Sequence, residues 1–258
     1  MYSAVILAGG ESPWLKEVTG TPYRAWAPLK GKPMALYIAD ALLKSGKVDK
    51  VLILGSTAAI PCSLPEKVEV IEAGDTLMST VRIALDYLGT ERPVIFSTDD
   101  IPCLTADAVR DFVEQAEKLH AQVCYTVIPK SAVEKDFPTA KRTYVKIKDE
   151  KFTGGNVFLV EPLVIPKCCE QVEAVFAKRK DVFSLCKWLG WSFIFKYIIG
   201  TLTLEQVEKR ASELFGFKGR AVITNYAAIG MDVDKIADWH LAQKFLTDKD
   251  KGEMEING

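Results

Sequence analysis

Apolar runs rich in β-branched residues recur along the chain, separated by segments whose apolar positions are spaced as in a helix. The runs predict strands at residues 4–8, 50–54, 68–71, 94–97, 123–128 and 221–224. Apolar positions three and four residues apart predict helices at residues 33–45, 76–88 and 106–119. Strands that alternate with helices form a mostly parallel sheet covered on both faces. The pattern therefore predicts an α/β fold.

The alternation stops between residues 162 and 216, where helical spacing continues without strands. Within this stretch, residues 188–204 read WLGWSFIFKYIIGTLTL and are strongly apolar. They include one lysine and two glycines, and they are fewer than a membrane-spanning helix requires. We expect a helical insertion whose aromatic face packs on the sheet domain or on a second subunit. Peripheral contact with a membrane is the alternative.

The chain shows no internal repeat and no linker rich in glycine and serine. We therefore expect one α/β domain over residues 1–247, with the helical insertion at 162–216 inside it. Residues 248–258 carry a run of alternating charges and are expected to form a flexible tail. The first residues lack the basic and apolar regions of a secretory signal. This favours a cytoplasmic protein.

Charge and cysteine spacing exclude two classes of function. The chain has 33 basic and 34 acidic residues, and a net charge of -1 leaves no basic surplus for nucleic acid. Any anionic partner should therefore be small. The six cysteines show no CxxC spacing, and both histidines lie far from them in sequence, so a zinc site is not expected. Reduced thiols fit the cytoplasmic assignment.

Two glycines, Gly9 and Gly10, follow the first predicted strand directly. Without side chains, main-chain N–H groups can approach a phosphate closely. A first strand that ends in such a turn suggests a nucleotide-binding α/β domain, although a glycine pair also suits a simple tight turn. The chain is expected to stay irregular from Gly10 to about Pro33.

Carboxylates follow two of the predicted strands. Asp99 and Asp100 come after the strand at 94–97, and Asp232 and Asp234 come after the last strand. The carboxyl ends of parallel strands face the crevice where ligands bind, and Mg²⁺ prefers one or two carboxylates together with phosphates. The sequence therefore predicts a metal site shared by Asp100 and Asp234. The alternative is that these residues form Asx turns or helix caps.

Five segments, in the same order, resemble motifs of the nucleotidyltransferase superfamily. This superfamily includes MobA-like guanylyltransferases, sugar-1-phosphate nucleotidyltransferases and cytidylyltransferases. The segments are the LAGG phosphate loop at 7–10, the PxxGKP step at 28–33, the DxP metal motif at 100–102, the glycine-rich acceptor loop at 153–156 and the DxD ending at 232–234. The resemblance implies a Rossmann-like domain of the nucleotide-diphospho-sugar transferase type.

The resemblance also implies an activity, which is Mg²⁺-dependent transfer of NMP from an NTP to a phosphorylated small molecule with release of pyrophosphate. It implies nucleotide binding by Leu7, Ala8, Gly9, Gly10, Gly74, Ser79 and Asp100. It implies acceptor binding by Thr153, Gly154, Gly155 and Asn156. It implies catalysis by Arg24 and Asp100, with Mg²⁺ held by Asp100 and Asp234.

Two of the site assignments have plainer alternatives. Gly74 and Ser79 lie at the predicted start of a helix, where a helix cap needs the same residue types. Arg142 precedes the acceptor loop and can lie beside an anionic acceptor, but a solvated surface role is the alternative.

Two positions depart from the family pattern. Trp14 stands where the family loop has an arginine against the triphosphate, and Arg24 stands where the family has a lysine. The planar guanidinium of Arg24 can neutralise phosphate but does not replace an ammonium group in geometry. These departures motivate a second hypothesis, a catalytically weakened nucleotide-binding protein with a regulatory or partner-docking role. A dinucleotide-dependent oxidoreductase is disfavoured because no GxGxxG pattern follows the first strand.

Overall fold

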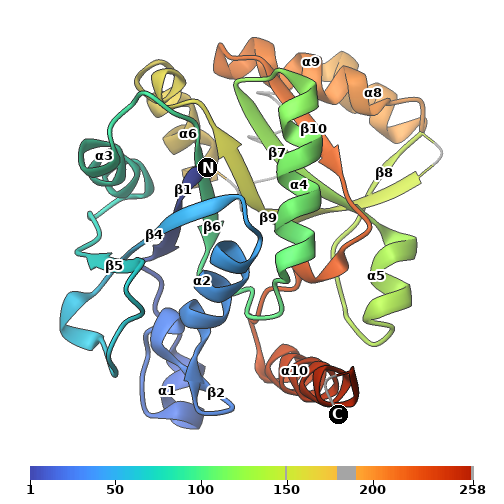
Figure 1. The fold of residues 1–258 in the computed structure, drawn as a ribbon. Coiled ribbons are helices and arrows are strands. Elements are labelled where there is room, and N and C mark those ends of the chain that lie inside the picture. Colours follow the sequence, from blue (N-terminus) through green and yellow to red (C-terminus); the bar gives the residue numbers. More distant parts are fainter. Residues whose placement is uncertain (149, 179–189, 257–258) are drawn as a thin grey trace.

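A computed structural model of the chain describes residues 1–148, 150–178 and 190–256. Its main sheet has eight strands, in the order β10-β7-β9-β6-β1-β4-β5, with β8 paired to β9 (Figure 1). The strands are β1 Tyr2–Ala8, β4 Val48–Gly55, β5 Val68–Ile71, β6 Val94–Thr98, β7 Val123–Pro129, β8 Val145–Ile147, β9 Glu150–Val160 and β10 Gly219–Ile223. Strand β9 runs antiparallel to β6, β7 and β8, and the other pairs are parallel. The predicted α/β fold with a mostly parallel sheet is confirmed.

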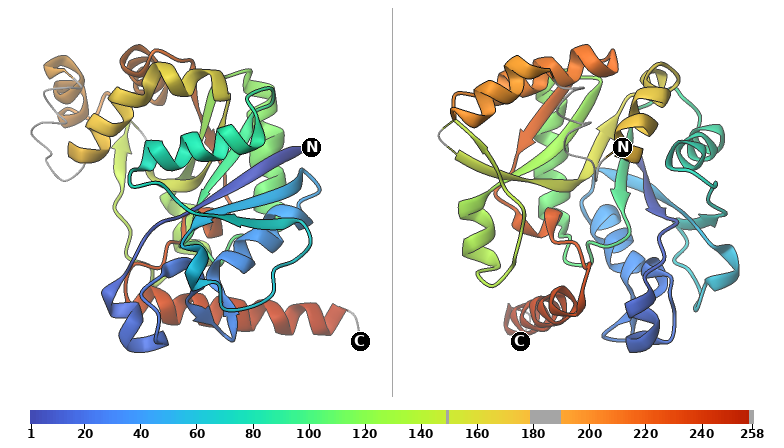
Figure 2. Two further views of the ribbon diagram at one scale, coloured as in Figure 1. Left: turned by 90° about the vertical axis from the view of Figure 1, so that its left-hand side faces the viewer. Right: turned by 180° about the vertical axis from the view of Figure 1, so that it is seen from behind.

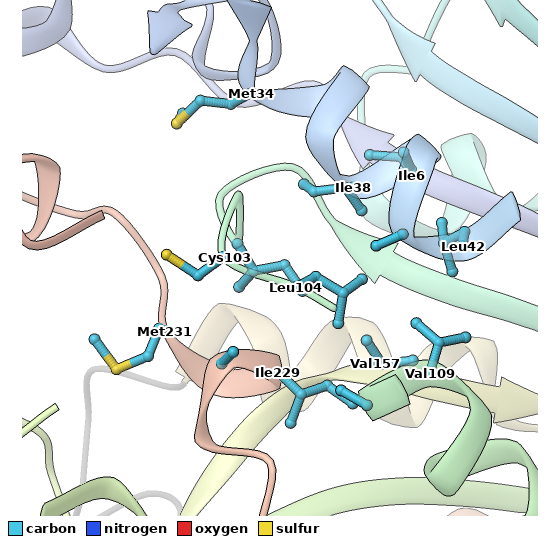
Figure 3. Packing of buried hydrophobic residues seen from close by; sticks show 14 of the residues in the cluster. Ile6, Met34, Ile38, Leu42, Cys103, Leu104, Val109, Val157, Ile229 and Met231 are labelled. Carbon is cyan, nitrogen blue, oxygen red and sulfur yellow. The ribbon is translucent and has the colours of Figure 1, made fainter. Parts of the chain in front are cut away.

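Helices cover both faces of the sheet. The α-helices are α1 Pro13–Thr19, α2 Met34–Lys44, α3 Leu77–Leu88, α4 Ala106–Leu119, α5 Lys130–Asp136, α6 Ile165–Lys178, α8 Trp191–Ile198, α9 Leu204–Phe215 and α10 Ile236–Ile256. Side chains alternate along β1, so that Ile6 packs in the core with α2 and α4, whereas Val5 packs with α3 and α6. Figure 3 shows the first of these cores, in which Ile38 and Leu42 of α2 lie near Val109 of α4.

Helix α10 lies along one side of the molecule, opposite α8 and α9 (Figure 2). Its Trp239 ring meets the Trp14 ring of α1 edge-on, with centroids 6.2 Å apart. Its Phe245 ring stacks on Phe137, which follows α5, at 5.1 Å. Helix α10 therefore packs against both α1 and the residue that follows α5, and its helical backbone continues to Ile256 rather than ending before the predicted tail.

The segment between Gly10 and Pro33 is not irregular, as the sequence analysis expects, because α1 lies within it. Proline occupies the first helical position, and Gly20 ends the helix in the left-handed region, at φ 82°. A short antiparallel pair, β2 Pro28–Leu29 and β3 Lys32–Pro33, then leads into α2.

The sequence analysis also expects a glycine-rich loop at residues 153–156. This expectation is wrong, because these residues lie inside β9. The pairing of β9 with β7 shifts register beside them, between Tyr125 and Val127. A Cβ at Gly155 would collide with Thr126 Oγ1 and lie 2.7 Å from Thr126 Cβ. The glycines therefore allow two backbones to approach closely within the sheet.

The described part of the predicted insertion is helical, with η3 Pro162–Val164, α6, α8 and α9. Of the apolar segment at 188–204, residues 188 and 189 lie outside the described residues. Phe193 and Ile194 of α8 line a cavity that residues of the sheet also line, and packing of the whole aromatic face on the sheet domain or on a second subunit stays a prediction. Among the described helices, none combines the length and apolarity that a bilayer crossing requires.

Candidate functional site

The glycine pair after β1 begins a loop that turns back on itself. Ser12 N donates to the Pro22 carbonyl at 2.7 Å, and Arg24 N donates to the Gly10 carbonyl at 3.3 Å. The segments on either side of α1 therefore run side by side, and this pairing fixes where the Arg24 side chain begins. A Cβ at Gly10 would collide with the guanidinium group of Arg24. Gly10 is thus required for the position of Arg24.

Gly9 has no comparable steric reason to be glycine. Its φ is not positive, and a Cβ there would meet among the described residues only the Ala73 Cβ, at an ordinary 3.7 Å. Gly9 is exposed, whereas the end of β1 is buried. Since glycine costs conformational entropy on folding, an open backbone at this position is consistent with a ligand that approaches it.

Arg24 lies in the short helix η1 Arg24–Trp26 and points into a group of aspartates. Its Nη1 lies 3.1 Å from Asp100 Oδ2 and 3.9 Å from Asp234 Oδ1, and its Nη2 lies 3.4 Å from Asp99 Oδ1. A fourth carboxylate, Asp232, acts electrostatically on the same arginine. We call the four the carboxylate cluster: Asp99, Asp100, Asp232 and Asp234.

Backbone contacts bring the two halves of the carboxylate cluster together across more than a hundred residues of sequence. Val233 N donates to the Asp100 carbonyl at 2.8 Å, so the last loop is tied to the end of β6. Thr98 Oγ1 donates to Asp100 Oδ1 at 2.6 Å and orients that carboxylate. Asp238 stands apart from the cluster, because its Oδ2 accepts the backbone N–H groups of Asp234 and Lys235 at the start of α10.

The glycines of β9 help to position this last loop. Gly230 ends η4 Ala227–Gly230, and a Cβ there would lie 3.1 Å from the Gly154 carbonyl oxygen and 3.4 Å from Gly155 Cα. Helix η4 therefore packs directly on the bare backbone of β9. The expected acceptor residues in β9 thus support the loop that carries Asp232 and Asp234.

Burial and crowding raise the pKa values of the cluster. Burial raises the pKa of Asp99 to about 7, and the charge of Arg24 opposes the rise. Burial also raises the pKa of Asp100, and partial burial followed by repulsion from Asp232 raises that of Asp234. Burial lowers the pKa of Arg24 but the aspartates, led by Asp99, raise it more. The carboxylate cluster therefore carries more negative charge than the guanidinium group of Arg24 neutralises.

Arg142 supplies the second cation near the cluster. It forms an ion pair with Asp232, and its side chain is largely buried. The structure therefore gives Arg142 a partly buried partner instead of the solvated surface position that the sequence analysis keeps as the alternative. Four carboxylates face two guanidinium groups here, an excess that a divalent cation would balance.

The carboxylate cluster offers oxygen atoms of the kind that Mg²⁺ prefers. Among the described residues, no group of three or more acidic, cysteine or histidine side chains surrounds one metal position. However, Mg²⁺ in phosphate sites uses one or two carboxylates, with phosphates and water completing the shell. Asp100 and Asp234 approach the same Arg24 nitrogen, and neither Asp99 oxygen has a hydrogen-bond partner among the described residues. These hard oxygen donors fit Mg²⁺ if the Arg24 side chain moves away from them.

The remaining predicted nucleotide residues at 74–79 have a structural role. Thr76 caps α3, because its Oγ1 accepts Ser79 N at 3.1 Å while Ser79 Oγ accepts Thr76 N at 2.8 Å. A Cβ at Gly74 would collide with Ser79 Oγ. The capping alternative therefore describes the geometry of Gly74 and Ser79, and nucleotide contact at these residues stays a prediction.

Two of the predicted acceptor residues in β9 have polar side chains, Thr153 and Asn156. Thr153 is buried, and Asn156 Nδ2 is buried without a hydrogen-bond partner among the described residues. A buried donor without a partner is costly in a folded protein. Asn156 therefore offers an unused amide donor two residues from Gly154.

The sequence analysis missed Tyr125 on β7. Its ring stacks on Phe158, and its hydroxyl group fills the space where a Gly154 side chain would lie. Burial raises the pKa of Tyr125, and the nearby charge of Arg142 opposes the rise. No sequence motif marks this tyrosine, since only the pairing of β7 with β9 brings it to Gly154.

The chain is similar in sequence to one protein family and to a nucleotidyltransferase. The sequence model of the MobA-like NTP transferase domain family matches residues 4–189. A glucose-1-phosphate thymidylyltransferase of Streptomyces griseus is 27% identical over 136 residues, which make up 49% of this chain and 38% of that relative. This chain thus matches well under half the length of that relative.

Two solved structures are similar over nearly the whole chain. A protein of Thermus thermophilus described as a hypothetical transferase is 33% identical, with a TM-score of 0.81 over 92% of this chain and 99% of that one. A CMP:2-keto-3-deoxy-manno-octonic acid synthetase solved with CTP is 14% identical. It has a TM-score of 0.59 over 96% of this chain and 100% of that one, which shows a shared fold.

Proposed function

Since this chain belongs to the MobA-like NTP transferase domain family, we propose that it is a magnesium-dependent nucleotidyltransferase. It would move an NMP group from an NTP to a phosphorylated small molecule and release pyrophosphate. The observation that carries the proposal is the convergence of Asp100 and Asp234 on Arg24, beside the Gly9–Gly10 loop. An anion-binding backbone, a cation and a pair of hard oxygen ligands are the parts that phosphoryl chemistry requires.

The Gly9–Gly10 loop and Arg24 would bind the triphosphate. Gly9 leaves the main chain open, and Arg24 carries a positive charge in a largely buried position. This charge is paired with Asp99, Asp100 and Asp234 of the carboxylate cluster. When an NTP binds, Arg24 would turn toward the phosphates and free the aspartates.

Asp100 and Asp234 would hold Mg²⁺, with Asp99 as a buried neighbouring charge. Mg²⁺ would neutralise the triphosphate and the charge that develops during transfer. Thr98 would keep the Asp100 carboxylate in place through its 2.6 Å hydrogen bond. Family membership supports this dependence, since the family is typically Mg²⁺-dependent.

The transfer would be a single in-line displacement. A phosphate oxygen of the acceptor forms a bond to the α-phosphorus of the NTP, and the bond from that phosphorus to the bridging oxygen of pyrophosphate breaks. No covalent bond to the protein is needed, so positioning and charge neutralisation are what its residues contribute. Arg142, which is paired with Asp232, and the unpartnered amide of Asn156 on β9 would bind the acceptor phosphate.

A weakened nucleotide-binding protein is the second candidate. Two observations favour it: Trp14 packs on Trp239 instead of supplying the family's arginine, and Arg24 is ion-paired to three carboxylates. Such a protein would bind an NTP but release no pyrophosphate.

Pyrophosphate release, measured with each NTP and a panel of phosphorylated acceptors, separates the two candidates. Asp100→Asn and Asp234→Asn should each reduce turnover at least about 100-fold. Asp232→Asn should be milder, because Asp232 pairs with Arg142 and not with Arg24. Asp86→Asn, at an exposed position on α3, is the matched control and should be unchanged. NTP binding without pyrophosphate release would favour the second candidate.

A further inference from the structure

A cavity of about 820 Å³ lies between the sheet and the helices that cover its α6 and α9 face. Its walls are mostly apolar side chains from several strands and helices, including Phe96, Phe152, Phe158, Val172, Phe193 and Val207. Protein interiors hold few voids larger than a water molecule, and ligand pockets span about 300–1,000 Å³. The size and the walls of this space are those of a site for a large apolar ligand.

One end of the cavity reaches the candidate active site. Leu7 and Gly154, which line it, lie next to the phosphate loop and in the expected acceptor segment. Tyr125 also lines it, and so does Val145, three residues after Arg142 in the chain. Arg142 is paired with Asp232 of the carboxylate cluster. The cavity wall thus includes a residue close along the chain to Arg142, and the Arg142–Asp232 pair links this segment to the proposed metal ligands.

The other part of the cavity lies against α8, where Phe193, Ile194 and Tyr197 line it. Tyr197 is also 43% exposed. Phe195 and Ile198, on the same helix, are 63% and 73% exposed. Helix α8 is thus apolar both where it lines the cavity and where it faces solvent.

We propose that the cavity binds the hydrocarbon chain of a lipid monophosphate, with the phosphate at the Arg142 end. The inference deepens the proposed function by naming the class of acceptor, and it rests on that function for the reaction. The apolar walls supply few partners for hydroxyl groups, so a sugar would lose hydrogen bonds to water on entering. A hydrocarbon chain loses none and gains from leaving water.

With such an acceptor, the proposed reaction is the same transfer as with any other phosphomonoester. An oxygen of the lipid phosphate bonds to the α-phosphorus of the NTP as the bond to pyrophosphate breaks. The product is a nucleoside diphosphate lipid, and pyrophosphate carries away the leaving electron pair.

Calorimetric titration with butyl, hexyl, octyl and decyl phosphate, each below its micelle concentration and without NTP, tests the inference. Affinity should rise about three- to fourfold for each added methylene group, until the chain fills the cavity. Decanol should bind more weakly than decyl phosphate, and Arg142→Gln should remove that difference. An affinity that does not change from butyl to decyl phosphate would overturn the inference.

A pair of variants on α9 locates the bound chain. Ala211 lines the cavity, so Ala211→Trp should fill it and flatten the dependence on chain length. Lys209 is exposed on the same helix, and Lys209→Trp should retain the wild-type dependence. Melting temperatures check that both variants fold. If Ala211→Trp does not fold, the chain-length dependence of the wild type still decides whether the inference holds. Equal chain-length dependence in the two variants would contradict binding in this cavity.

The outcomes separate this inference from the proposed function. Because the alkyl phosphates are titrated without nucleotide, a protein that binds no NTP can still show the chain-length dependence, and then only the proposed function fails. Pyrophosphate release with a sugar phosphate, together with a flat alkyl series, would contradict the lipid acceptor alone.

Discussion

The chain has two glycine pairs that look alike in sequence but differ in their surroundings. Gly9 and Gly10 follow the buried strand β1 and open a loop, whereas Gly154 and Gly155 lie inside β9. At Gly155 a side chain would collide with Thr126 of the neighbouring strand. At Gly9 it would make only one ordinary contact among the described residues. Packing thus requires the glycine at Gly155, whereas Gly9 leaves its backbone exposed.

This difference separates glycines that the packing of the fold requires from a glycine that leaves its backbone open to a ligand. The β9 pair lets Gly230 and the last loop approach, which brings Asp232 and Asp234 to the end of β6. The β1 pair is divided, since Gly10 makes room for Arg24 and Gly9 supports nothing in the described structure. We therefore expect substitutions in β9 to act on stability and substitution of Gly9 to act on binding.

Gly155→Val should have the largest effect on stability. The added side chain would overlap Thr126 within a buried strand pair, and overpacking of a core costs about 3 kcal/mol at the upper end of its usual range. Urea denaturation measures the loss in the free energy of unfolding. A loss below about 0.5 kcal/mol, the usual range for surface positions, would show that the β7–β9 contact yields easily.

Gly154→Ala should destabilise the protein by about 2 kcal/mol, because the new methyl group would overlap the Tyr125 hydroxyl. Removing that hydroxyl leaves the Tyr125 Cζ at 3.1 Å from the same position. The double variant Gly154→Ala/Tyr125→Phe should therefore recover about half of the loss, as a double-mutant cycle would show. Additive effects of the two substitutions would contradict a direct contact.

Gly9→Ala should leave the free energy of unfolding within about 0.5 kcal/mol of the wild type. NTP affinity should fall about tenfold, since a methyl group would crowd the backbone that the triphosphate is proposed to approach, and tenfold corresponds to about 1.4 kcal/mol. Calorimetric titration with the NTP, beside urea denaturation, separates the two effects. An unchanged affinity would remove Gly9 from the nucleotide site.

Trp14→Arg should lower the free energy of unfolding by about 1 kcal/mol, less than either substitution in β9, because the edge-on contact with Trp239 is lost. The change also brings back the cation that the family places after its glycine pair. Thermal melting measures the first consequence, and NTP titration shows whether the arginine also strengthens binding. Unaltered stability would mean that the Trp14–Trp239 pair does not hold α10 against α1.

Much of the fold could be predicted from the sequence because buried parallel strands and amphipathic helices leave strong periodic patterns. Strands β1, β4, β6 and β7 and helices α2, α3 and α4 all lie where the pattern predicts them. Strand β9 was missed because its two glycines are typical of a turn. Only its pairing with β7 explains why they lie in a strand.

The candidate site could be predicted in its parts but not in its contacts. Motif order drew attention to Asp100, Asp234 and Arg24, yet no pattern along the chain indicates that the arginine would be ion-paired to the aspartates. Tyr125 and the pairing of Arg142 with Asp232 depend on strand register and on a backbone bond between distant loops. Such contacts belong to tertiary structure and leave no local signal.

The most direct test of the account is calorimetric titration of the four NTPs into the wild type and Asp100→Asn, each with and without Mg²⁺. The account predicts that one NTP binds the wild type more tightly when Mg²⁺ is present, and that Asp100→Asn loses this dependence while its melting temperature shows a folded protein. If no NTP binds the wild type, or if Mg²⁺ strengthens binding equally in both proteins, Asp100 does not belong to a metal–nucleotide site.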